Sequence, residues 1–314
     1  MRRAALFAVL AGAGIAAAQN YPAKPVRMLT AEVGGGSDFA ACLVAQGLSA
    51  ALGQQVVVEN RAGGGVIAEA AARAPADGYN LLCYGSTIWL LPFLREQVSF
   101  DPQRDFAPVI WLASAPNLLV VHPSLPVKSV RDLIALAKAH PGELNYSTGP
   151  AGTTLHLSAE LFKAMAKTDI VHVPYKGVSL ALNDLIAGRV QLMFPTPGSV
   201  TQHVKNGRLR ALAVTSAQPS ALLPGLPTIA ATGLPGYESI SVFAIFAPAK
   251  TPAAIIQRLN QETQAVLKTA ETRARFLNAG VEPVGGPPEQ LAALMKSEMA
   301  KWGKVIRDAG LRAE

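Results

Sequence analysis

The sequence lacks the short motifs by which many enzymes are identified. It contains no G-x-S-x-G, no C-x-x-C and no H-E-x-x-H, so a nucleophile elbow, a redox dithiol motif and a helical zinc motif are all without support. Charged residues make up only 16% of the chain, and its basic residues are scattered, without a run or stripe. A nucleic-acid-binding face needs clustered basic residues, so we expect no nucleic-acid partner, although a mildly positive field helps to gather anionic solutes.

Cysteine is also scarce, with only Cys42 and Cys83 in 314 residues. Cys42 falls in a predicted helix and Cys83 in a predicted strand, and apolar residues flank both. Export would permit a disulfide between them. The pattern favours two separate, buried thiols over that alternative.

The first residues resemble an export signal. Arg2 and Arg3 precede an apolar run over 4–18, which ends in small residues before Gln19, as an A-x-A cleavage site requires. The run is shorter than the roughly 20 apolar residues of a membrane span. We therefore expect residues 1–18 to be a cleaved signal peptide of a periplasmic protein; a buried N-terminal helix is the alternative.

Apolar residues, in contrast, are abundant. They make up 50% of the chain, which is enough for a large folded core. Apolar segments alternate in length and period along the sequence, which predicts strands and helices in turn and βαβ units with parallel sheets. The predicted strands are 26–30, 55–59, 80–84, 144–147, 170–173, 190–194, 209–215 and 239–247. The predicted helices are 38–52, 66–73, 131–139, 154–167, 180–187, 252–269, 271–279 and 287–308.

The order of these segments predicts two α/β lobes. The strand over 239–247 is long and apolar enough to cross back to the first lobe, so we expect hinge crossings near 115–123 and 236–246. The predicted division is 19–119 with 243–314 for lobe 1, and 120–242 for lobe 2. A ligand would sit between the lobes, where strand ends and helix starts meet.

Loops of small and hydroxyl residues follow three of the predicted strands. They are 34–38 (GGGSD), 85–87 (GST) and 147–154 (STGPAGTT), and the first and the third open a predicted helix. Backbone N–H groups and hydroxyls at a helix start favour an anion. Because the three loops are spread over both lobes, they predict an anion site between them.

Two other patterns are weaker. Residues 63–68 match G-x-G-x-x-A, but the strand after them does not end in the acid that would hold a ribose, so we interpret the match as a turn. His156 and Glu160 stand four apart on one predicted helix and could share a metal, although a contact along the helix face is the simpler interpretation. We expect no cofactor, no metal and no catalytic residue.

The chain resembles the Bug family, the TctC-type receptors of tripartite tricarboxylate transporters, over nearly its whole length after the signal. The segment 171–177 (VHVPYKG) is the most specific. The other matching segments are 21–27 (YPAKPVR), 57–61 (VVENR), 77–79 (DGY), 156–162 (HLSAELF), 209–215 (LRALAVT) and 282–286 (EPVGG).

This resemblance implies a type II periplasmic-binding-protein fold of two α/β lobes joined by a two-stranded hinge, which closes on a small carboxylate. It implies a monomeric receptor, not an enzyme, that serves integral-membrane transporter subunits. A periplasmic signalling receptor or an enzyme on the same scaffold is the alternative function. Main-chain groups and hydroxyls hold the carboxylate in the family, and the matching positions here are Gly34, Gly35, Ser37, Ser86, Thr87, Ser147, Gly149, Thr153, Thr154 and Thr196, with Tyr175 lining the cleft.

Two departures from the family pattern bear on the ligand. Pro195 stands where many relatives have an Asp, and it offers neither charge nor N–H. A buried ammonium group would then lack a partner, which predicts a carboxylate without an ammonium group, with an apolar or aromatic body beside Trp89, Phe194 and Pro197. Glu32 is the exception to this argument, because it could replace the missing Asp if it faces the ligand.

Overall fold

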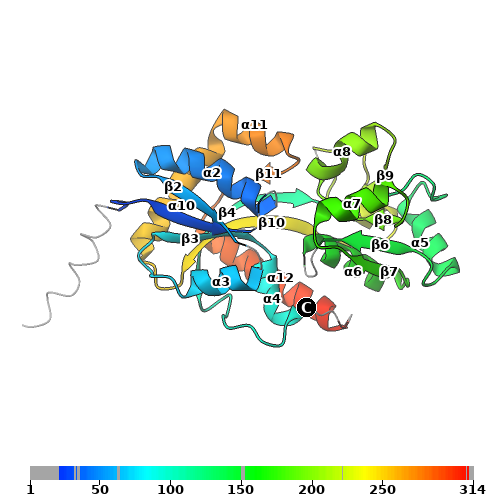
Figure 1. The fold of residues 1–314 in the computed structure, drawn as a ribbon, viewed down its shortest axis with the longest axis horizontal. Helices are drawn as coiled ribbons and strands as arrows, with labels where there is room; N and C mark the ends of the chain where they lie inside the picture. The colour runs from blue at the N-terminus through cyan, green and yellow to red at the C-terminus, as the bar shows by residue number, and fades with distance from the viewer. Residues whose placement is uncertain are drawn as a thin grey trace, which may run out of the picture.

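The computed structural model describes residues 21–31, 33, 36–61, 64–149, 153–220, 222–308 and 310. The predicted signal peptide and Glu32 therefore lie outside the described residues. Two mixed sheets, each covered by helices, form two lobes side by side (Figure 1). We call the part built on the six-stranded sheet lobe 1 and the part built on the five-stranded sheet lobe 2.

The sheet of lobe 1 has the strand order β11-β4-β10-β3-β1-β2. Its first three strands along the chain run parallel to one another, as predicted, but β10 runs antiparallel to both β3 and β4. The strands are β1 (Val26–Thr30), β2 (Val56–Asn60), β3 (Asn80–Gly85), β4 (Phe106–Pro116), β10 (Ile240–Pro248) and β11 (Glu282–Pro283). Its helices are α2 (Gly36–Leu52), α3 (Gly64–Ala72), α4 (Thr87–Leu94), α10 (Ala253–Lys268), α11 (Ala270–Asn278) and α12 (Pro288–Asp308).

The sheet of lobe 2 has the order β7-β6-β8-β5-β9, in which β5 runs antiparallel to β8 and β9. The prediction of purely parallel sheets is thus wrong for both lobes, because a strand that crosses between lobes enters each sheet from the opposite direction. The strands are β5 (Leu118–Val121), β6 (Asn145–Thr148), β7 (Val171–Pro174), β8 (Leu192–Met193) and β9 (Arg210–Val214). The helices are α5 (Val130–Ala139), α6 (Thr154–Ala166), α7 (Val178–Ile186), α8 (Pro197–Lys205) and α9 (Ile229–Thr232).

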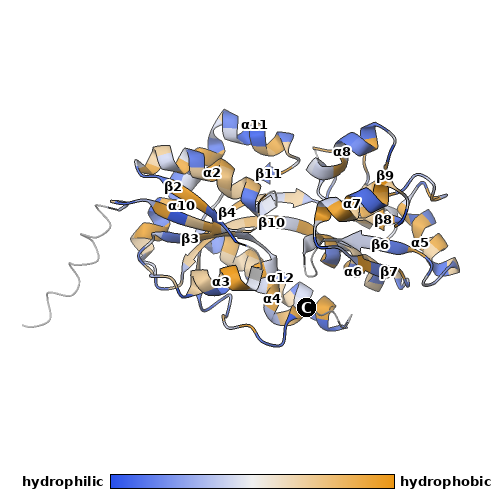
Figure 2. Cartoon of the chain, viewed as in Figure 1, coloured by the Kyte–Doolittle hydropathy of each residue, from blue (hydrophilic) through white to orange (hydrophobic). Residues whose placement is uncertain are grey.

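β10 is buried on both of its faces, which explains its continuous apolar sequence. Phe243 and Ile245 point into the core beneath α2 and α10, whereas Val242, Ala244 and Phe246 point into the core beneath α3, α4 and α12. In Figure 2 β10 and α3 are coloured mainly as hydrophobic, while α11 is mainly hydrophilic. β10 is therefore the central strand on which the parts of lobe 1 are assembled.

The chain crosses between the two lobes at two places. β4 ends at Pro116 and β5 begins at Leu118, so Asn117 alone joins them. The return runs from the end of β9 to the start of β10, and its backbone pairs with Asn117 through Thr215, whose N–H donates to the Asn117 carbonyl at 3.0 Å. Ser239 N–H in turn donates to the Thr215 carbonyl at 2.9 Å. The two crossings therefore lie side by side.

Both cysteines are free thiols in this structure. Cys83 is buried in β3, but Cys42 is exposed, and the prediction of two buried thiols is wrong for it. Cys42 lies on the outer face of α2, where an apolar neighbourhood in sequence does not mean a buried side chain. In the described part of the chain, no helix is both long and apolar enough to cross a bilayer.

Candidate functional site

The carboxyl ends of the parallel strands of both lobes point toward the same part of the molecule. In Figure 1, β1 and β6 both end beside the crossing strands β4 and β10, and the helices that follow them begin there. We call this part, with the starts of α2, α4, α6, α7 and α8, the interlobe region. It is where an open α/β sheet ordinarily binds a ligand.

In lobe 1, the first residues of α2 and α4 lie together on β10. A Cβ atom on Gly36 would be 2.7 Å from the ring of Phe243, and one on Gly85 would be 2.9 Å from the Val242 carbonyl oxygen and 3.8 Å from Ser37 Oγ. Only glycine permits such close approach. The structure thus places Ser37 beside Gly85, at the end of β3.

Asn60 fixes the loop between β1 and α2. Its Nδ2 donates to the Ala31 carbonyl at 2.7 Å and to Asp38 Oδ1 at 2.6 Å. A carboxylate in the first turn of α2 also interacts favourably with the positive end of that helix. Asn60 was not predicted to hold this loop, because nothing in a strand-end Asn indicates which loop it will contact.

In lobe 2, the end of β6 meets the start of α7. A Cβ atom on Gly149 would be 3.1 Å from Val178 Cγ2 and 3.3 Å from Val178 N. Ser147 is fully buried, and its hydroxyl donates to the Ala181 carbonyl of α7 at 3.4 Å. Of these two predicted residues, Gly149 lies at the helix start, whereas the Ser147 hydroxyl points into α7.

Three stacked aromatic rings support the same loop, which follows β6. The ring of His172 lies between those of Tyr146 and His156, with centroid distances of 4.7 and 4.3 Å. The Thr148 hydroxyl donates to the Gly149 carbonyl at 2.8 Å, so His172 Nε2, 2.7 Å from the same hydroxyl, is the donor to it. The stack therefore ties β7 to the loop that follows β6.

Burial keeps this stack neutral. It lowers the pKa of His156 to about 4, with a smaller contribution from His172, while the Glu160 carboxylate opposes the shift. Burial lowers the pKa of His172 as well. Glu160 accepts hydrogen bonds from the Tyr146 hydroxyl and from Lys163 Nζ. Within the described residues, no three His, Cys, Asp or Glu side chains are placed to hold a metal ion.

Three helices that begin in the interlobe region differ from three helices elsewhere at the residue that immediately precedes the helix. Ser129, Thr228 and Thr269 precede α5, α9 and α11, and each hydroxyl accepts the usual hydrogen bond from a first-turn N–H. In the described part of the chain, the side chains of three corresponding residues in the interlobe region make no such capping bond, and they are Ser86, Thr153 and Thr196. The first-turn N–H groups of α4, α6 and α8 therefore receive no capping bond from these three side chains and can donate to other acceptors.

The start of α8 also contacts lobe 1 directly. A Cβ atom on Gly198 would lie 2.7 Å from the Ala279 carbonyl, and one on Gly280 would lie 2.8 Å from Pro197 Cβ. Thr196 therefore lies beside a contact between the lobes. Pro195 is buried, and its carbonyl accepts the Leu118 N–H at 2.8 Å.

The remaining predicted residues are placed less centrally or outside the described chain. Thr87 and Thr154 are the first residues of α4 and α6 and are half-buried. The Tyr175 hydroxyl donates to Asp184 Oδ2 at 2.7 Å, on the flank of α7. Gly34 and Gly35 are not among the described residues.

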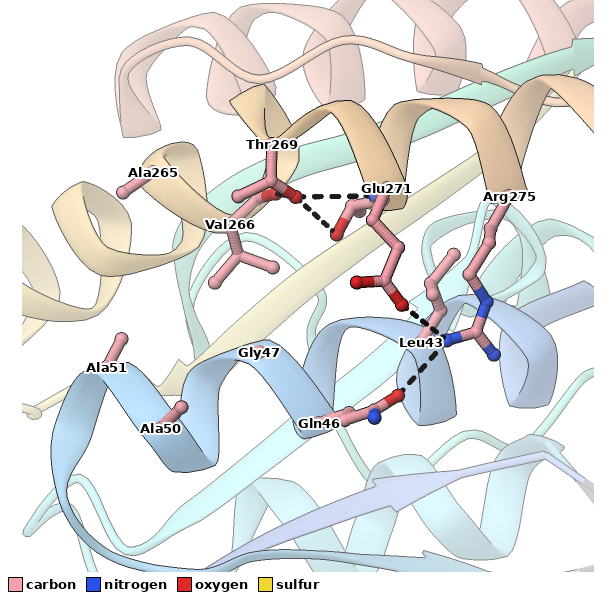
Figure 3. A pocket seen from close by; sticks show the side chains of 11 residues that line it. Leu43, Gln46, Gly47, Ala50, Ala51, Ala265, Val266, Thr269, Glu271 and Arg275 are labelled. Atoms are coloured by element: carbon pink, nitrogen blue, oxygen red, sulfur yellow. Dashed lines mark hydrogen bonds and ion pairs between the residues drawn. The ribbon is translucent and has the colours of Figure 1, made fainter.

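A groove of about 560 Å³ lies elsewhere on lobe 1, between α2, α10 and α11. Ala50, Ala51 and Ala265 line it at one end, and Arg275 closes the other through Gln46 and Glu271 (Figure 3). Because it follows the carboxyl-terminal half of α2, it lies away from the interlobe region.

Comparisons of sequence and of structure with known proteins indicate one family. The model of the tripartite tricarboxylate transporter family receptor (TctC) matches residues 40–311. The chain is 36% identical to the protein BugT of Bordetella pertussis, over 96% of this chain and 95% of BugT. The structure of R. palustris Rpa4515 with adipate superposes with a TM-score of 0.85 at 40% identity, covering 93% of this chain and 99% of that one. MatC from Rhodopseudomonas palustris with bound malate gives 0.81 at 27% identity, covering 91% and 100%.

Proposed function

The chain belongs to the tripartite tricarboxylate transporter receptor family, and we propose that its interlobe region captures a small carboxylate lacking an ammonium group and presents it to membrane transporter subunits. The protein is a solute-binding receptor of the periplasmic type and not an enzyme. Its ligand, its site residues and its closing movement are the subjects of the proposal.

The observation that carries the proposal is the contrast between the two sets of helix starts. A hydroxyl that does not cap its own helix can donate to a carboxylate oxygen, and the first-turn N–H groups can do the same. Ser86 supplies this arrangement in lobe 1, and Thr196 supplies it in lobe 2. A carboxylate held by both lobes would favour their closed arrangement by its additional contacts there.

The ligand class follows from the charges near these helix starts. Pro195 brings no carboxylate to lobe 2, and the Asp38 carboxylate in lobe 1 is engaged by Asn60. A buried ammonium would lack a counter-charge from either. The relatives solved with adipate and malate support a carboxylate without nitrogen, and adipate supplies an apolar body between two carboxylates.

Mass spectrometry of the small molecules released on denaturing the purified protein identifies the ligand directly. A thermal-shift panel of dicarboxylates, aromatic acids and acidic amino acids then tests the class, since a ligand at a hundred times its Kd adds about 2.7 kcal/mol of stability. Stabilisation by aspartate or glutamate alone would refute the ligand class, and Glu32→Gln would then show whether Glu32 holds the ammonium.

Threonine variants test the site. We expect Thr153→Ala/Thr154→Ala to weaken carboxylate binding by about tenfold to a hundredfold, the loss of hydrogen bonds to a charged group. Thr228→Ala is the matched control: its hydroxyl caps α9, so it should lower the free energy of unfolding by about 1 kcal/mol without changing affinity. Equal affinity losses in both variants would contradict the assignment.

The cellular setting completes the proposal. Residues 1–18 direct export and are removed, so the mature protein acts in the periplasm as a monomer with lobes 19–119 plus 243–314 and 120–242. N-terminal sequencing of protein from the envelope fraction and light scattering of the mature protein test these points. A mature chain beginning at Met1 or a stable dimer would refute the corresponding statement.

A further inference from the structure

Ser158 on α6 joins three parts of the structure that are distant in sequence. Its side chain is fully buried, and its hydroxyl donates to the Thr154 carbonyl, one turn earlier, at 2.7 Å. Ser239 Oγ, at the end of the return crossing, lies 2.8 Å from Ser158 Oγ, and Asn117 Nδ2 lies 3.2 Å from it. The first residue of α6 is thus linked to both crossings through one oxygen.

Asn117 completes the link to β10. Its Oδ1 accepts a hydrogen bond from Ser241 Oγ at 3.2 Å, and its N–H donates to Thr215 Oγ1 at 2.7 Å. Asn117 and Thr215 are fully buried, and Ser241 is nearly so. Side chains of β10, of both crossings and of α6 therefore form one hydrogen-bonded cluster, which we call the crossing cluster.

The donors in the crossing cluster have a fixed direction. Ser158 has a single hydroxyl proton, and it goes to the Thr154 carbonyl, so Ser239 must donate to Ser158. Asn117 Nδ2 also donates to Ser158, while Asn117 Oδ1 receives the proton of Ser241. Removing Ser158, Asn117 or Ser241 takes a hydrogen-bond partner from a buried polar atom of a neighbouring member, which is costly in a buried cluster.

We propose that Ser158 and Asn117 are positioning residues for ligand binding: they hold the first turn of α6 at a fixed orientation to the crossing strands. This rests on the proposed function, because the ligand is taken to bind at that first turn, at Thr153 and Thr154. A rotation of the lobes about Asn117 then changes the orientation of α6, and a ligand bound to α6 shifts the equilibrium between the rotated states. Neither residue contacts the ligand.

Hydrogen exchange tests the coupling without any ligand. Ser241 lies on β10, and its hydroxyl is linked to α6 through Asn117 and Ser158. In Ser241→Ala, we expect exchange of the Leu157 amide, which bonds to the Thr153 carbonyl, to accelerate by about fivefold to tenfold, the effect of one buried hydrogen bond. Unchanged exchange in α6, with a change confined to β10, would overturn the proposal.

A matched control separates coupling from general loosening. Ser49 on α2 makes the same bond to a carbonyl one turn earlier, at 2.8 Å, and accepts one more from Val56 N, but it is not part of the crossing cluster. Ser49→Ala should leave α6 exchange at the wild-type rate. If Ser241→Ala does not fold, Ser239→Ala removes the parallel donor to Ser158 and makes the same prediction.

Binding of adipate adds a readout that a purely structural role would not change. With adipate as the probe, Ser241→Ala should raise Kd about tenfold and reduce the shortening of a lobe-to-lobe spin-label distance at saturation, whereas Ser49→Ala should do neither. A wild-type protein that binds neither adipate nor the molecule released on denaturation refutes the proposed function, and the exchange result then stands alone. Normal affinity and closure in Ser241→Ala overturn the positioning role.

Discussion

The two lobes supply similar groups to the interlobe region but support them in different ways. In lobe 1 the turns at Gly36 and Gly85 rest directly on β10, against the Phe243 ring and the Val242 carbonyl. In lobe 2 the corresponding loop rests on polar side chains, the histidine stack on one side and the crossing cluster on the other. Apolar contact depends on shape, whereas polar contact depends also on protonation and on every partner being present. The two lobes should therefore lose stability under different perturbations.

Acid should produce the largest difference between them. The pKa of His156 is about 4 in the folded protein and about 6.5 in an unfolded chain. Below pH 6.5 the unfolded chain therefore binds a proton that the folded one does not. The stability contributed by neutral His156 is complete above pH 6.5 and falls by up to about 3 kcal/mol as the pH drops to 4.

Hydrogen exchange at pH 7 and pH 5 can assign this loss to lobe 2. Amides of β6 and α6 should lose protection over that interval, and those of β1 and β3 should not. His172, Glu160 and Lys163 act on the pKa of His156, and the Tyr146 ring is stacked 6.4 Å from the His156 ring. His156→Phe keeps a ring against His172 but cannot titrate, so its lobe 2 should respond less to acid. Parallel loss of protection in both lobes of the wild type would contradict the comparison.

Adding a methyl group to a glycine should cause the next largest loss of stability, and the loss should be greater in lobe 1 than in lobe 2. The Cβ of Gly85→Ala would lie 2.9 Å from the Val242 carbonyl, which is backbone held between β3 and β4, whereas that of Gly149→Ala would meet a Val178 methyl group at 3.1 Å. We expect Gly85→Ala to lower the free energy of unfolding by about 1–3 kcal/mol and Gly149→Ala by less. Denaturant titration of both variants measures this, and the reverse order would show that the lobe 2 loop is the more tightly packed.

The sequence indicated where the two lobes' helix starts would lie, but not how they are supported. Alternating segment lengths located β1, β2, β3 and β6 and the helices that follow β1, β2 and β6, because each is a regular element with its own period. α4 was missed because TIWLLPFL is apolar all round and has no helical period. β4 was missed because two irregularities in its pairing with β10 interrupt strand alternation.

The supporting residues could not be predicted for a different reason. Asn117, Ser158 and Ser241 are ordinary polar residues within apolar segments, and their partners are between 41 and 124 positions away. Nothing local distinguishes such a residue from one on the surface, since its role is fixed only when the two lobes are assembled. The same holds for His156 and His172, whose stacking requires β7 to pair beside β6.

Removing a surface ion pair on lobe 1 should have the smallest effect on stability. Arg27 and Arg61 both donate to Glu59, at the end of β2. Hydrogen bonds from Arg27, and then from Arg61, lower the pKa of Glu59. The contribution of Glu59 to folding stability is therefore present above the ordinary carboxyl pKa and is lost as the pH falls below it.

Because the Glu59 side chain is about a third exposed, we expect Glu59→Gln to cost less than about 1 kcal/mol at neutral pH. That cost should shrink further in 0.5 M salt, where exposed charges are screened. Asp184→Ala in lobe 2 is the comparison variant, since it removes the ion pair with Arg189 and the acceptor of the Tyr175 hydroxyl. Thermal unfolding at low and high salt compares the two: the Glu59→Gln effect should be mostly salt-sensitive, and part of the Asp184→Ala effect should persist in salt because the Tyr175 bond is not an ion pair. A large, salt-independent loss in Glu59→Gln would mean that lobe 1, too, depends on a polar support at its strand ends.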